Sequence, residues 1–83
     1  MDYKIVEITW LDAWDDTAYL EEAATENLAP IERRNVGYLI KGDADKVIIT
    51  SGVINNLYAG KVFIDGVIVI PRSMITEIKV IND

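Results

Sequence analysis

The chain has 83 residues and a formal net charge of −6, and it contains no cysteine and no histidine. This length fits a single small domain over residues 1–83, because typical domains have about 100–150 residues. The composition excludes disulfides, cysteine–histidine zinc sites and catalysis by histidine or cysteine. Association between subunits is then the expected supplement to so small a core.

Acidic and β-branched residues occupy different parts of the chain. Residues 11–34 carry seven acids against two arginines, a charge of −5, whereas residues 35–83 carry five acids and five bases. Residues 46–83 contain nine Ile and six Val, a composition that favours strands. The segment rich in Ala and Glu favours helix. The sequence therefore predicts a strand, an acidic helical insert and a β-rich remainder.

The first predicted strand covers residues 3–10. Within it Val6, Ile8 and Trp10 alternate with polar residues, the period of a strand with one buried face. Trp10 and Trp14 stand four residues apart. We expect them to cover the open end of the barrel beneath the insert, and the alternative is that they line an interface, where tryptophan is enriched.

The acidic insert, at about residues 15–28, is predicted to hold a helix of about ten residues. Leu20, Ala24 and Leu28 lie at helical spacing and would form a narrow apolar stripe. Asn27 and Pro30 would end the helix. Three residues are candidates for its amino-terminal cap: Asp15, Asp16 and Thr17.

Two further strands, at residues 35–41 and at 46 to about 53, are predicted to form a hairpin around the turn-like composition of residues 42–45. Residues 61–70 are apolar except for Asp65-Gly66, which is either a two-residue hairpin turn or a bend within one long strand. Pro71 interrupts this run, since proline cannot donate to a ladder, and a last short strand follows at 75–81.

Some of these strands are apolar on both faces, as in residues 47–49 and 67–70. In a sheet with one solvent-exposed face, apolar and polar residues should alternate along each strand, so these continuous apolar runs indicate that both faces are covered. One small barrel has a single interior, and we therefore expect a homo-oligomer rather than a monomer. The candidate interface residues are Ile48, Val67, Ile68 and Val69.

The order of elements resembles the SH3-like small barrels, and Sm-like proteins in particular. Residues 61–70 look like the second Sm motif, in which an apolar run is broken by a basic residue plus glycine and then resumes. Short phage-encoded Sm-like proteins show features similar to Trp10–Ala13, Val36–Leu39 and Ile70–Ser73 of this chain. The resemblance spans nearly the whole chain.

This resemblance implies a mainly β fold: a small, strongly bent, five-stranded antiparallel barrel with one short helix after the first strand. It further implies a ring of five to seven subunits joined edge to edge through β-strands. Sm-like rings typically bind single-stranded RNA through the loop between the second and third strands and near the motif glycine. Here Asp43 and Asp45 occupy that loop and Asp65 precedes the glycine. Acidic side chains are therefore present at the positions where RNA phosphate would bind.

No catalytic residue, metal site or cofactor is predicted. Asp12, Asp15 and Asp16 are interpreted as acids at the start of a helix rather than as paired catalytic carboxylates. Asp43 and Asp45 lack the ordered set of six or more oxygens of a calcium loop, and they are interpreted as a turn.

Nucleic-acid binding requires a basic patch, because phosphate contacts dominate affinity. Only two of the eight basic residues are adjacent in the sequence. A tyrosine on a strand could stack on a base. The weak candidates for such binding are Arg33, Arg34, Tyr38, Lys41 and Arg72.

The leading hypothesis is a non-enzymatic, phage-type accessory or structural protein that works as a homo-oligomeric ring. The alternatives are a ring that binds single-stranded RNA or DNA and an adaptor that presents its acidic helix to a basic partner. No stretch approaches the ~18 apolar residues of a membrane span, and residues 1–4 lack a signal-peptide pattern. We expect a cytoplasmic protein without membrane partners, in the host cytoplasm if a phage encodes it.

Overall fold

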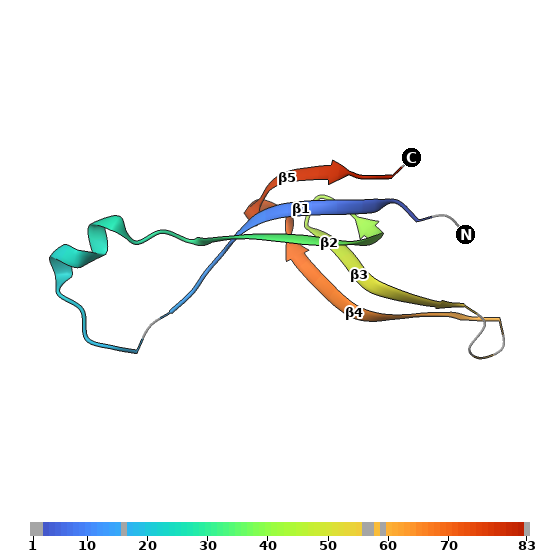
Figure 1. The fold of residues 1–83 in the computed structure, drawn as a ribbon, viewed down its shortest axis with the longest axis horizontal. Coiled ribbons are helices and arrows are strands. Elements are labelled where there is room, and N and C mark those ends of the chain that lie inside the picture. Colours follow the sequence, from blue (N-terminus) through green and yellow to red (C-terminus); the bar gives the residue numbers. More distant parts are fainter. Residues whose placement is uncertain (1–2, 16, 56–57, 59, 83) are drawn as a thin grey trace.

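The computed structural model describes residues 3–15, 17–55, 58 and 60–82. Its five antiparallel strands form one open sheet in the order β4-β3-β2-β1-β5 (Figure 1). The strands are β1 (Ile5–Asp12), β2 (Ile31–Gly42), β3 (Lys46–Asn55), β4 (Val62–Pro71) and β5 (Ile75–Val80). Two short 3-10 helices are η1 (Glu22–Asn27) and η2 (Arg72–Met74). The predicted mainly β fold with five antiparallel strands is thus confirmed.

The sheet is curled, because its two outer strands follow one another in the chain. The outer strands of a flat five-stranded sheet would lie about 19 Å apart. Only η2 separates the end of β4 from the start of β5, and the four residue steps from Pro71 to Ile75 span at most about 14 Å. The two edges must therefore approach each other here. Register shifts at Thr9/Trp10 and Leu39/Lys41 contribute, since bulges bend strands.

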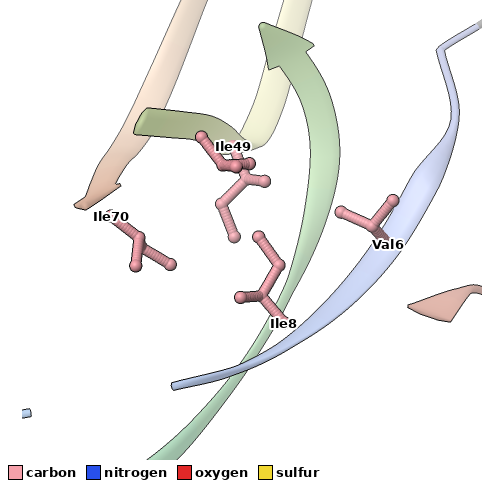
Figure 2. Close-up of a cluster of buried hydrophobic side chains, with 5 residues drawn as sticks. Val6, Ile8, Ile49 and Ile70 are labelled. Carbon is pink, nitrogen blue, oxygen red and sulfur yellow. The ribbon is translucent and has the colours of Figure 1, made fainter. Parts of the chain in front are cut away.

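The concave face of this curl carries the core. Val6 and Ile8 of β1 belong to the same buried cluster as Ile70 of β4, although two strands separate β1 from β4 in the sheet (Figure 2). Complete burial of one such side chain stabilises the fold by about 1.5–3 kcal/mol. Trp10 packs against the cluster, so the predicted core face of the first strand is confirmed. The core residues, each 1% exposed or less, are Val6, Ile8, Val47, Ile49 and Ile70.

The acidic insert contains less helix than predicted. In place of about ten residues it holds η1, six residues of 3-10 helix without a side-chain cap hydrogen bond. Of the predicted caps, Asp15 and Thr17 precede η1, and Asp16 lies outside the described residues. No residue of η1 is buried. Tertiary packing therefore does not offset the cost of nucleating a helix, and only short i→i+3 turns form.

Strands β1 and β2 extend further into the insert than predicted. Their pairing continues until Asp12 lies opposite Ile31, whereas the predicted strands ended at residue 10 and began at residue 35. Four of the six residues of this extension are polar, and its two apolar residues, Leu11 and Ile31, are too few to show an alternating pattern. The extension contains an ion pair of 2.7 Å between Arg33 Nε and Asp12 Oδ2.

Asp65-Gly66 forms a bend within one strand and not a hairpin turn. Strand β4 pairs with β3 on both sides of the bend, with Asp65 opposite Gly52 and Val67 opposite Thr50. Gly66 has a φ of 61°, in the left-handed region that glycine adopts without a steric penalty. The Thr50 hydroxyl also donates a hydrogen bond to the Asp65 carbonyl oxygen at this point.

Replacing Gly66 by alanine should destabilise the protein by about 1–2 kcal/mol from backbone conformation alone, because the position requires a positive φ. A further loss is expected because the new Cβ would collide with the Ser51 hydroxyl. Chemical denaturation measures both terms. The control is Gly66→Ala in a Ser51→Ala background. This variant should regain the stability lost to the collision with the Ser51 hydroxyl, but not the stability lost to the positive φ. An unchanged midpoint in Gly66→Ala would contradict the bend.

Candidate functional site

The two edges of the sheet expose apolar side chains. On β4, Val67 and Val69 are exposed, and Ile48 lies opposite Val69 on the same convex face. Ile68 lies opposite Ile49 and packs against the core instead. On the other edge, β5 exposes Ile78 and Val80. Three of the four predicted interface residues therefore lie on the convex face, next to an edge that a single chain leaves unpaired.

Arg33 and Arg34 do not form one basic patch. They are neighbours on β2, so their side chains point to opposite faces of the sheet. Arg33 pairs with Asp12, and Arg34 Nε lies 3.3 Å from Glu32 Oε1. Each of these arginines thus has an acid of its own chain as a partner.

Lys41 lies at the opposite end of β2, eight strand residues and at most about 26 Å from Arg33, and Arg72 of η2 reaches the same end. They flank the loop at residues 43–45. Arg72 Nε donates to the Asp43 carbonyl oxygen at 3.0 Å, and its backbone N–H donates to the Asp45 carbonyl oxygen. Tertiary structure therefore adds to this acidic loop a guanidinium from 29 residues along the chain.

Asp43 organises the same loop. Its Oδ1 accepts hydrogen bonds from the backbone N–H groups of Asp45 and Lys46, both at 2.9 Å. The Lys46 ammonium lies 3.6 Å from Oδ2. The two backbone hydrogen bonds, with smaller contributions from the charges of Lys46 and Lys41, hold the pKa of Asp43 below its usual value.

Tyr38 lies apart from both groups of basic residues. It is half-buried in the middle of β2, opposite Ile5 and Thr50. Its ring meets that of Tyr3 edge to face, with centroids 6.4 Å apart. The five candidates for nucleic-acid contact are thus divided among three places on the molecule.

The two tryptophans also have different roles. Trp10 packs against the core, and its Nε1 donates to Asn35 Oδ1 at 2.8 Å. Trp14 lies outside the sheet, and its Nε1 donates to the Ala29 carbonyl oxygen at 2.6 Å. The expectation that both cover the open end of the barrel is therefore wrong for Trp14, because the chain leaves the sheet at Asp12.

Trp14 lines a pocket of about 450 Å³ within the insert, together with Leu20, Leu28, Pro30 and the carboxylate-bearing Asp15. The sequence singled out Leu20 and Leu28 as members of a helical stripe. The structure brings them to one pocket through a loop and a short 3-10 helix instead. Spacing alone did not indicate this site.

Neither a metal cluster nor a membrane-spanning helix is found in the described parts of the chain. Over residues 3–15, 17–55, 58 and 60–82, no three acidic side chains gather as metal ligands would. In those same ranges, no helix has the length and apolar character needed to cross a membrane.

Comparison of the chain with protein-family models, with curated proteins and with solved structures finds no match. The likeness to Sm-like proteins consequently depends on the short motifs of the sequence.

Replacing Asp43 by asparagine should lower the melting temperature at pH 7. The difference in melting temperature from the original protein should disappear in acid. The lowered pKa means that the ionised Asp43 stabilises the folded state above its unfolded pKa of about 4. This contribution disappears as the pH falls through the lower folded pKa. Thermal melts from pH 7 to pH 2.5 should show the difference from the original protein shrinking below about pH 4.

Asp45→Asn is the matched control. It removes one charge from the same loop and leaves both hydrogen bonds to Asp43 Oδ1 in place. We expect it to cost less stability at pH 7. A constant difference between Asp43→Asn and the original protein at every pH would contradict the assignment.

Proposed function

We propose that this protein is a non-enzymatic Sm-like barrel protein whose working unit is a homo-oligomeric ring of five to seven subunits. It would be a phage-type accessory or structural protein. The observation that carries the proposal is the pair of edge strands, β4 and β5, which expose apolar side chains beside unpaired backbone groups. The curled five-stranded sheet, with Pro71 before its last strand, also fits the resemblance.

The topology favours a closed ring over an isolated dimer. Each chain has one β4 edge and one β5 edge, and the antiparallel sheet ends at both. If β4 of one subunit pairs with β5 of the next, every subunit uses both of its edges in the same way. Such head-to-tail contacts close into a ring when the rotation between subunits allows it. The curl of the sheet supplies a rotation at each contact.

Ring formation would also supply the stability that a small core lacks. Five apolar side chains are fully buried in the described part of a single chain. A domain of this size is marginal without metals, disulfides or partner subunits. Edge pairing would give hydrogen-bond partners to the open backbone edges of β4 on one subunit and of β5 on its neighbour.

Val69→Asp should convert the ring to monomers, because it places a charge on the exposed apolar edge strand at which the proposed contact forms. Size exclusion with light scattering should then give one chain mass of 9.3 kDa in place of five to seven times that mass. Val36→Asp is the matched control, since Val36 on β2 and Val69 are each 55% exposed. It makes the same substitution away from both edges and should leave the assembly intact. A monodisperse monomer of the original protein would overturn the proposal.

A second candidate function is binding of single-stranded RNA or DNA by this ring, at the loop between β2 and β3. The favouring observation is the position of Arg72, which reaches the loop next to Lys41 and Lys46. These three bases meet the acids Asp43 and Asp45, so the local charge is slightly positive rather than negative. A ring would repeat this site around its axis.

A mobility-shift titration with poly(U) at low salt tests this candidate. We expect a shift that Lys41→Ala with Arg72→Ala weakens about tenfold, because phosphate contacts dominate such affinity. Arg33→Ala with Arg34→Ala removes the same number of charges at the other end of β2 and should have little effect. The absence of any shift at tens of micromolar protein would remove this candidate.

A further inference from the structure

Residues 13–15 and 17–30, between β1 and β2, extend away from the sheet, and we refer to them as the arm (Figure 1). The molecule measures 58 Å along its longest axis but 26 and 20 Å along the others. No residue of η1 is buried, and every described residue of the arm is exposed. The apolar side chains of the arm are therefore not used by the core of their own chain.

Hydrogen bonds within the arm hold it as a closed loop. The Trp14 indole N–H donates to the Ala29 carbonyl oxygen, which ties the outgoing limb to the returning limb. At the tip, Ala24 N–H donates to the Glu21 carbonyl oxygen and Leu28 N–H to that of Thr25. The ion pair of Asp12 with Arg33 lies at the base. The pocket walls thus belong to one connected loop.

The pocket in the arm suits a single large apolar side chain with some backbone. Its volume of about 450 Å³ lies within the range of ligand pockets, about 300–1,000 Å³. Trp14, Leu20 and Leu28 form its walls, yet each is 42–54% exposed. Contiguous apolar surface of this kind marks an interaction site, and tryptophan is a frequent anchor in such sites.

The charge around the pocket selects the partner. Asp15 lines it, and Glu21, Glu22 and Glu26 lie on or beside η1. The sequence has no lysine or arginine between Lys4 and Arg33. This unbalanced negative field attracts cationic partners and repels nucleic acid, and the arm of a second copy carries the same charge.

We propose that the pocket of the arm binds a basic segment of a partner protein, with one apolar anchor residue inserted beside Trp14 and flanking lysines or arginines facing the acids. This inference does not depend on ring formation, because all the residues of the site belong to one chain. In a ring the site would be repeated, and a partner with several basic segments would gain affinity through avidity.

The probe for this proposal is a fluorescein-labelled peptide, Lys-Lys-Phe-Leu-Lys-Lys, titrated against the full chain by fluorescence anisotropy. We expect binding that weakens as salt is added. Two comparison peptides separate the contributions: one replaces Phe-Leu by Gly-Ser, and the other replaces the lysines by glutamates. Both should bind at least about tenfold more weakly, since the site needs an apolar anchor and a positive flank.

Variants of the chain locate the binding. Trp14→Ala and Leu28→Ser should each weaken binding about tenfold, and Leu28→Ser keeps the Trp14–Ala29 hydrogen bond because that bond uses other atoms. Glu21→Gln with Glu22→Gln and Glu26→Gln should weaken binding and flatten its salt dependence. The matched control neutralises three acids outside the arm, Glu7→Gln with Asp45→Asn and Glu77→Gln, and should have little effect.

Several outcomes would overturn the proposal. Equal binding of the Gly-Ser peptide would mean that the pocket is unused, and an equal effect of the control triple would mean that net charge alone acts. Binding unaffected by either Trp14→Ala or Leu28→Ser would place the peptide elsewhere. If Trp14→Ala instead changes the mass measured by light scattering and leaves peptide binding intact, the arm contacts a second copy of the chain.

Discussion

The packing of the buried cluster that contains Ile70, Val6 and Ile8 is the contact on which the rest of the structure depends (Figure 2). It joins β4 to β1 across a sheet in which two other strands separate them. This contact buries the concave face and makes the convex face the outer one. It also leaves the backbone edges of β4 and β5 open, and β4 presents Val67 and Val69 beside its edge. The surface proposed for assembly is thus a direct consequence of how the core closes.

The molecule separates two kinds of surface. The sheet carries nearly balanced charge and apolar edges, which suit contacts with further copies of itself. The arm carries most of the negative charge together with an apolar pocket, which suits a cationic partner. Because the arm grows from the extended pairing of β1 and β2, it stands clear of the sheet. The two proposed binding surfaces therefore share no residue.

The candidate sites were only partly predictable from the sequence. Ile48, Val67 and Val69 were predicted as interface residues because apolar side chains on both faces of a strand indicate that both faces are covered, and the structure places all three on the convex face. Arg72 was recognised as a base, but its position at the loop of Asp43 depends on a contact across 29 residues. Trp14 was expected near the barrel end, and the pocket that it lines depends on how the two limbs of the arm meet. Pairings of this kind leave no periodic signal in a sequence.

The sequence alone was enough to determine the strands and the core face, because the signals for both are local. These signals are the alternation of Val6, Ile8 and Trp10, the runs of β-branched residues, and the breaks at residues 42–45 and Pro71. Tertiary structure alone decided three other features. It kept β3 paired on both sides of Gly66, so Asp65-Gly66 became a bend. It extended β1 and β2 through mostly polar residues whose partners lie across the strand pair. It also left the insert with no other element to pack against. Because packing does not stabilise a longer helix there, the Ala- and Glu-rich segment forms only the short 3-10 helix η1.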